Sequence, residues 1–263
     1  NYNFGPADRL VNFAEDNDMA VRGHTLIWHT QLPSWITQVN WTREQMIEIM
    51  RDHIHTVVGR YKGRIGAWDV VNEAIADNGT LRNTVWLQRI GPEYIALAFE
   101  FAHEADPDAL LFYNDYSAEG SGAKSDAVYN LMQSLKQNGT PIHGVGFQMH
   151  VSTSFAPTAA QVAANMERLG NLGLQVHITE MDVRMPLPPN GNELAKQAEI
   201  YERMLNVCLD AFNCTAFVLW GFTDKYSWVP NQFSGQGAAL IFDEAYEPKP
   251  AYRWLLDVLK DSD

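Results

Sequence analysis

Two glutamates each follow a short apolar segment, and together they could cleave a glycosidic bond. Glu73 ends the run Trp-Asp-Val-Val-Asn-Glu, and Glu180 ends the run Val-His-Ile-Thr-Glu. Glycoside hydrolysis needs two carboxyl groups: a protonated one releases the leaving group, and an ionised one attacks the sugar or activates water. The neighbours of the two glutamates differ, which suits two different roles.

The residues beside each glutamate indicate what those roles are. Asn72 precedes Glu73, and its amide could orient the carboxyl group or bind a substrate hydroxyl. Asp182 follows Glu180 and could orient a histidine that hydrogen-bonds the reactive carboxylate and keeps it ionised. Either pair alone more often has a structural role. The prediction therefore depends on similar residues recurring at the ends of several strands. Further polar and aromatic residues end other apolar runs: His24, Gln148, His150 and Trp220.

Metal and serine chemistry are less well supported by the sequence. His24 and His29 are five residues apart, so in a strand they would lie on opposite faces and would not share a metal. The cysteine and carboxylate spacing of zinc sites is missing, as is a Gly-x-Ser-x-Gly nucleophile motif. We therefore expect neither a metal nor a cofactor.

Apolar strands and amphipathic helices alternate along the chain. Thr42 and Thr158 each lie three residues before a glutamine, the pattern of a capping box at a helix start. Strands are expected at 20–27, 65–71, 109–113, 144–149, 174–179 and 215–221. Helices are expected at 6–16, 43–61, 123–137, 193–210 and 249–260, from Gly91-Pro92, and from Thr158.

The strands are apolar on both faces, which is typical of a parallel sheet covered by helices. Their repeat of roughly 30–45 residues fits a (β/α) barrel, in which chemistry occurs at the carboxyl ends of the strands. An open doubly wound sheet is the alternative, but no glycine-rich phosphate loop follows the first strand. Only six strands are evident, and an open remnant would expose two edges. We therefore expect a fragment, or an N-terminal piece supplied separately.

The composition is that of one globular domain spanning residues 1–263. The chain is 46% hydrophobic and has a formal net charge of −13, which disfavours binding to nucleic acid or to anionic membranes. No run approaches the ~20 apolar residues of a membrane span.

The spacing of the cysteines and the asparagine sequons indicates whether the protein is secreted. Cys208 and Cys214 flank a predicted helix–strand junction, which permits a disulfide without proving one. Four Asn-x-Ser/Thr sequons favour a secreted, glycosylated protein; they are Asn40, Asn78, Asn138 and Asn213. Asn213 lies beside the cysteine pair, so its use is least expected.

Five motifs carry a resemblance to a known family: Arg-Gly-His-Thr-Leu-Ile-Trp-His at 22–29, Trp-Asp-Val-Val-Asn-Glu at 68–73, Gly-Phe-Gln-Met-His at 146–150, Ile-Thr-Glu-Met-Asp at 178–182, and Trp-Gly-Phe-Thr-Asp at 220–224 with Ser227-Trp228. Together they closely resemble glycoside hydrolase family 10, the retaining endo-β-1,4-xylanases, over the whole length of the chain. The resemblance implies a (β/α)8 TIM barrel with a groove for xylan.

The resemblance also implies residue roles. Glu73 would be the general acid/base, Glu180 the nucleophile, and Asp182 a support for His150. Residues expected to bind xylan or xylo-oligosaccharides are His24, Trp28, Asn72, Gln148, His150, Trp220 and Trp228. Cys208 and Cys214 match a disulfide often seen in the family, which supports secretion.

The chain departs from the family at its front. Members carry a strand, a helix and a second strand before the segment matched by Asn3-Phe4-Gly5. The catalytic domain is therefore expected to be incomplete at its N-terminus, and a monomer unless a separate N-terminal fragment completes the barrel. Two other functions stay open: a β-1,4-glucanase on the same fold, and a non-catalytic xylan-binding protein.

Overall fold

The computed structural model describes residues 2–261, which fall into two compact units. The first unit contains residues 2–115 and 130–144, and the second contains 116–129 and 145–261. Helix α6 (Ala123–Gln137) contributes its first half to the second unit and its second half to the first. Within residues 2–261, no helix combines the length and apolar character needed to cross a membrane.

Three parallel strands position the residues of interest in the first unit. They are β1 (Arg22–Gly23), β2 (Ala67–Asn72) and β3 (Leu110–Asp115). Strand β2 lies between the other two and pairs with both in parallel. Every residue of β2 is buried, as expected for a parallel strand covered on both faces. Glu73 therefore emerges directly from a rigid, buried element.

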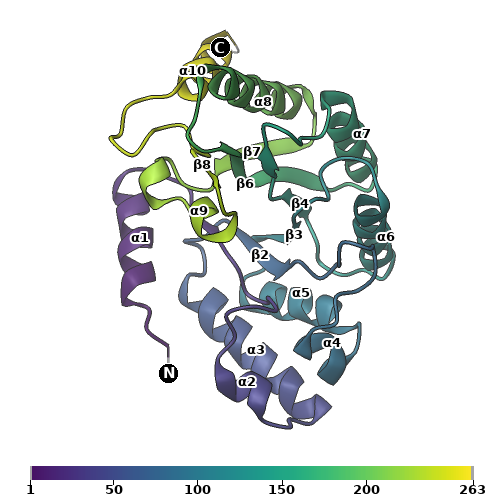
Figure 1. The fold of residues 1–263 in the computed structure, drawn as a ribbon. Coiled ribbons are helices and arrows are strands. Elements are labelled where there is room, and N and C mark those ends of the chain that lie inside the picture. Colours follow the sequence, from purple (N-terminus) through teal and green to yellow (C-terminus); the bar gives the residue numbers. More distant parts are fainter. Residues whose placement is uncertain (1, 262–263) are drawn as a thin grey trace. The chain divides into compact units, whose positions relative to one another are not determined.

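Five helices lie wholly in this unit: α1 (Gly5–Asp16), α2 (Ser34–Gln38), α3 (Arg43–Arg60), α4 (Val85–Ile90) and α5 (Tyr94–Ala105). Helix α3 starts at the predicted capping box of Thr42 and Gln45 and packs beside α5 (Figure 1). Its fully buried residues, spaced four apart, form one apolar stripe: Met46, Met50, Ile54 and Val58.

Five strands belong to the second unit: β4 (Gly144–Phe147), β5 (His150–Ser152), β6 (Gln175–Pro186), β7 (Cys214–Leu219) and β8 (Gln236–Gly237). The long strand β6 pairs with the other four along different parts of its length. Its pairing is parallel with β5 and β7 and antiparallel with β8. The register with β5 sets His150 opposite Asp182.

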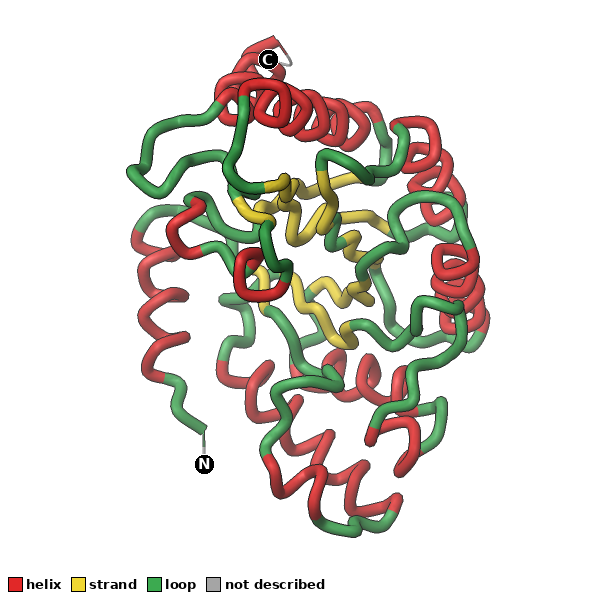
Figure 2. Tube along the Cα trace, in the orientation of Figure 1, coloured by secondary structure: helices red, strands yellow, loops and turns green. Residues whose placement is uncertain are grey.

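The helices of this unit are α7 (Ala159–Gly170), α8 (Gly191–Asp210), α9 (Val229–Gln232) and α10 (Pro250–Asp261). Helix α7 begins at the predicted capping box of Thr158 and Gln161. Helices α8 and α10 pack side by side (Figure 1). Between β7 and α10 the chain is mostly loop, apart from the short helix η1 (Asp224–Tyr226), α9 and β8 (Figure 2).

Each of the six predicted strands overlaps an observed strand, but the boundaries differ. The first is limited to Arg22–Gly23, with one isolated bridge from Ile27 to Val71. Strand β6 extends to Pro186 because it finds partners in β5 and β8, which were not predicted. The helix expected to open at Gly91-Pro92 instead begins at Tyr94, and Gly91, with φ 102°, ends α4. Helices α2, α4 and α9 were missed because they are too short for a periodic pattern.

Candidate active site

The predicted site residues divide between the two units. His24, Trp28, Asn72 and Glu73 belong to the first unit. The second unit carries Gln148, His150, Glu180, Asp182, Trp220 and Trp228.

The backbone of Glu73 is held in an unusual conformation. Its φ of 58° lies in the left-handed region, which non-glycine residues seldom adopt. Its N–H donates to the carbonyl of Asn114 at 2.9 Å, and its own carbonyl accepts from Arg82 Nε at 2.8 Å. Such strain persists only where the surroundings hold it and is concentrated at functional sites. The Glu73 side chain, 13% exposed, is thus presented from a fixed point.

Two polar side chains lie beside the Glu73 carboxyl group. Asn72 Nδ2 is 3.4 Å from Glu73 Oε1, and His29 Nε2 is 3.9 Å from Glu73 Oε2. Asn114 Nδ2 donates to Asn72 Oδ1 at 3.0 Å, which turns the amide nitrogen of Asn72 toward the carboxyl group. The sequence predicted a role for Asn72 here. It also placed Asn114 and His29 at strand ends but predicted no role for either.

A buried aspartate in β2 orients His24. Asp69 is 1% exposed, is paired with the Arg22 guanidinium, and lies 3.0 Å from His24 Nδ1 through its Oδ2. Burial alone would raise the pKa of Asp69, but the Arg22 charge and the contact with His24 lower it below its ordinary value. Asp69 was missed as a site residue. A charged residue inside a largely apolar run needs buried partners, and that was the available signal.

Trp28 and His24 share the wall of a cavity of about 630 Å³ in the first unit. The Trp28 ring lies edge-on to His24, with ring centroids 6.5 Å apart, and its carbonyl accepts from Trp86 Nε1 at 2.8 Å. Trp35 and Trp86 also line this cavity. Aromatic walls with a few polar groups are typical of small-molecule sites.

In the second unit, the His150 ring lies between two carboxylates. Its Nε2 is 3.1 Å from Glu180 Oε2, and its Nδ1 is 3.0 Å from Asp182 Oδ2. A neutral imidazole can donate from only one nitrogen, so two acceptors favour the doubly protonated cation. Burial opposes this charge, but the hydrogen bonds to Asp182 and Glu180 outweigh burial and raise the pKa of His150 to about 9. The cation thus donates to Glu180 at neutral pH. The predicted chain of contacts from Asp182 through a histidine to Glu180 is present.

Two tryptophans contact this group. Trp228 Nε1 donates to Asp182 Oδ2 at 2.7 Å, and its ring centroid is 4.9 Å from that of His150. The Trp220 ring lies edge-on at 6.4 Å from the His150 ring, and Trp220 is 37% exposed, which leaves surface for a ligand. Sequence reasoning placed both tryptophans at the site but missed the bond from Trp228 to Asp182.

A buried ion pair fixes the loop that carries Trp228. Lys249 Nζ lies 3.0 Å from Asp224 Oδ2 and donates to the carbonyls of Ala238 and Leu240 at 2.6 Å each. Asp224 Oδ1 accepts the Leu240 N–H at 2.8 Å. These contacts tie the start of the loop to its end, so the position of Trp228 does not depend on the loop alone.

Gln148 is buried, and its carbonyl accepts the Glu180 N–H at 3.2 Å. The contact joins the residue after β4 to the glutamate of β6. Across residues 2–261, no three or more His, Cys, Asp or Glu side chains are grouped so as to hold a metal ion.

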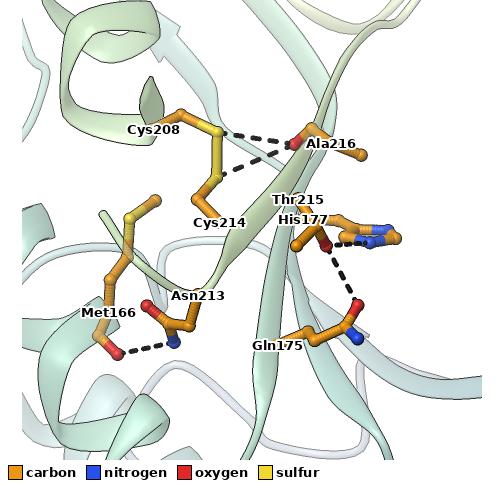
Figure 3. The surroundings of a disulfide bond; sticks show 8 residues. All are labelled: Met166, Gln175, His177, Cys208, Asn213, Cys214, Thr215 and Ala216. Atoms are coloured by element: carbon orange, nitrogen blue, oxygen red, sulfur yellow. Dashed lines mark hydrogen bonds between the residues drawn. A yellow bond between two sulfur atoms is a disulfide. The ribbon is translucent and has the colours of Figure 1, made fainter. Parts of the chain in front are cut away.

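The predicted disulfide is present and joins Cys208 near the end of α8 to Cys214 at the start of β7 (Figure 3). Beside it, the Asn213 amide is buried and donates to the carbonyl of Met166 at 2.9 Å (Figure 3). It also donates to the carbonyl of Leu174 at 3.0 Å. A glycan on that nitrogen is incompatible with this packing. The other three sequon asparagines are exposed: Asn40, Asn78 and Asn138.

The model of glycosyl hydrolase family 10 matches residues 1–258. This chain belongs to that family. It is 51% identical over 261 residues to endo-1,4-beta-xylanase B of Thermotoga neapolitana, an alignment that covers 99% of this chain and 75% of that protein. With endo-1,4-beta-xylanase 1 of Humicola insolens it shares 43% identity over 259 residues, 98% of this chain and 60% of that protein.

Two solved xylanase structures are also similar to this chain in sequence and in fold. Xylanase 10B from Thermotoga petrophila RKU-1, in complex with xylobiose, has a TM-score of 0.97 and 52% identity, covering 100% of this chain and 81% of that one. Native xylanase 10B from Thermotoga maritima has a TM-score of 0.97 and 53% identity, covering 99% and 81%. The family 10 match and these neighbours confirm the predicted fold class, a TIM barrel of which six predicted strands are evident, and the predicted glycoside hydrolase class. The assignment of 1–263 to one catalytic domain stays a prediction.

Proposed function

We propose that this family 10 enzyme is a retaining endo-β-1,4-xylanase that hydrolyses internal bonds of xylan by double displacement. The observation that carries the proposal is His150, a cation held between Glu180 and Asp182. A cation that donates to Glu180 forms a charge-assisted hydrogen bond, which orients this carboxyl group for attack on the sugar. The names of the relatives support the substrate, as does the xylobiose bound by the Thermotoga petrophila enzyme.

The proposed reaction has two steps. Glu180 attacks the anomeric carbon and forms a glycosyl ester, while the Glu73 carboxyl group gives its proton to the leaving oxygen. Glu73, now ionised, takes a proton from water, and that water attacks the anomeric carbon and releases Glu180. Asn72, beside the Glu73 carboxyl group, would bind the 2-hydroxyl of the sugar under attack.

The remaining residues would bind the sugar chain. The indole rings of Trp28, Trp220 and Trp228 offer apolar surface to sugar rings. His24, Gln148 and His150 would provide the polar contacts of the central subsites. Asp182 would act through His150, whose orientation it sets.

We also propose a secreted, glycosylated monomer. Disulfides persist in oxidising compartments, and the sequons at Asn40, Asn78 and Asn138 are exposed. A separate N-terminal fragment has no support from the comparisons and stays a prediction.

The test follows the product anomer during hydrolysis of an aryl β-xylobioside by proton NMR. We expect the β-anomer first and the α-anomer only through later mutarotation. An α-anomer that forms first would refute retention. Faster turnover of aryl cellobioside would favour the β-1,4-glucanase alternative, and xylobiose binding without turnover would favour the non-catalytic one.

A further inference from the structure

Glu119 is a buried carboxyl group in the second unit, in the loop between β3 and α6, and the proposed mechanism does not use it. The residue is 4% exposed, and its Oε1 accepts the backbone N–H of Met149 at 2.8 Å. A buried carboxyl group is costly unless it is hydrogen-bonded. This bond satisfies the buried carboxyl group and at the same time fixes the position of the Met149 peptide.

Met149 connects two proposed substrate-binding residues, Gln148 and His150. Its φ of 63° is left-handed, which costs free energy in a residue that is not glycine. The carbonyls of Gln148 and Met149 accept the N–H groups of Glu180 at 3.2 Å and Asp182 at 3.4 Å. The Met149 peptide thus lies at the break between β4 and β5, against the segment of β6 that carries both carboxylates.

The loop that carries Glu119 is itself anchored. Asn165 on α7 is buried, and its Nδ2 donates to the carbonyls of Ala118 at 2.7 Å and Glu119 at 3.1 Å. Arg168 Nε in turn donates to Asn165 Oδ1 at 2.7 Å. Because α7 fixes the backbone of Glu119, its carboxyl group can act as a fixed acceptor for Met149.

We propose that Glu119 is a positioning residue, which holds the left-handed Met149 peptide and thereby sets the His150 ring against Glu180 and Asp182. This role requires no contact between Glu119 and the sugar. The kinetic consequence rests on the proposed function, whereas the placement of His150 can be tested without turnover.

The test compares three substitutions of Glu119 with a matched control. E119A removes the acceptor, E119Q keeps an acceptor oxygen at the same reach, and E119D keeps the carboxyl group but withdraws it by one methylene. The control is D106A in the first unit, because Asp106 is also buried and its Oδ2 accepts the Gly63 N–H at 3.0 Å. Each variant is examined by kcat and KM on aryl xylobioside, by melting temperature, and by NMR of the His150 ring N–H protons, assigned with H150N.

E119A should lose the two protected His150 ring signals and lower kcat/KM by about 10²-fold, as a misplaced reacting group does. E119D should behave like E119A. If E119A does not fold, E119D tests whether Glu119 positions His150. E119Q should keep the His150 ring signals and most of the activity. D106A should lower only the melting temperature. Unchanged His150 signals in folded E119A or E119D, or equal losses in D106A, would overturn the inference. A wild-type chain without turnover would refute the proposed function, and the His150 signals would still decide the role of Glu119.

Discussion

Trp228 and His150 donate to the same oxygen of Asp182, from Nε1 at 2.7 Å and Nδ1 at 3.0 Å. The other oxygen, Oδ1, is buried without a hydrogen-bond partner among the described residues. The orientation of Asp182 therefore depends on these two donors. Trp228 is thus linked to Glu180 through Asp182 and His150, in addition to any contact that it makes with a sugar.

W228F should show this link, because phenylalanine keeps an aromatic ring but has no N–H. A buried carboxylate that loses one donor should lower the free energy of unfolding by about 1.5–3 kcal/mol. We also expect kcat to fall, since His150 loses part of its support. The control is W41F, which removes the bond from Trp41 Nε1 to the Trp35 carbonyl, an exposed contact of 2.9 Å. Equal urea midpoints and kcat values for the two variants would contradict the proposed link.

Stability should fall in alkaline solution because of His150. Its folded pKa, about 9, is above the ordinary value of 6.5, so folding favours the protonated ring. The contribution is fully present below pH 6.5, decreases as pH rises toward 9, and is lost above that value. At 1.36 kcal/mol per pH unit it amounts to about 3 kcal/mol. The measurement is the free energy of urea unfolding from pH 6 to 10 for wild type and H150Q. A difference between them that does not change with pH would refute the prediction.

E180A should abolish turnover because no carboxylate remains to attack the anomeric carbon. Azide should restore turnover and give the α-xylosyl azide, since it attacks from the face that Glu180 occupied. E73A is the matched variant: it should still accept substrates with good leaving groups, and azide should then yield the β-azide. On xylan, which has poor leaving groups, E73A should lose about 10²–10⁴-fold. A β-azide from E180A would reverse the two assignments.

Removal of the disulfide should destabilise the chain modestly. Cys208 and Cys214 are separated by 6 positions, so the bond closes a short loop. The entropy of closing such a loop predicts a loss of about 2 kcal/mol in the C208A/C214A variant. Urea unfolding measures it, and unfolding of the wild type in reductant should give a similar value. Unchanged stability in both would show that the bond contributes little.

Local signals explain what could be predicted. The capping boxes at Thr42 and Thr158 join residues three positions apart, so the sequence pattern contains the whole interaction. The cysteine pair is close for the same reason. Strand existence was predictable from apolar runs, whereas β5 and β8 were not, because they owe their structure to pairing with β6 rather than to a pattern of their own.

The contacts around the site were harder to predict because they join residues that are far apart in the sequence. His150 and Asp182 are 32 positions apart, and their link was predicted only through the family resemblance. The partners of Asp69 and the donor from Trp228 are 45 to 47 residues away in the sequence. No local sequence pattern specifies which tryptophan or arginine will contact Asp69 or Asp182 in the folded chain.

The sequence by itself determined the residue types at the strand ends, the helix starts, the cysteine pair and the family resemblance, because these depend on identity and short spacing. Only the tertiary structure decided the left-handed backbones of Glu73 and Met149 and the raised pKa of His150. The reason is physical. A backbone strain is maintained by the groups that surround it, and a pKa depends on how closely strands β5 and β6 bring two carboxylates to one ring.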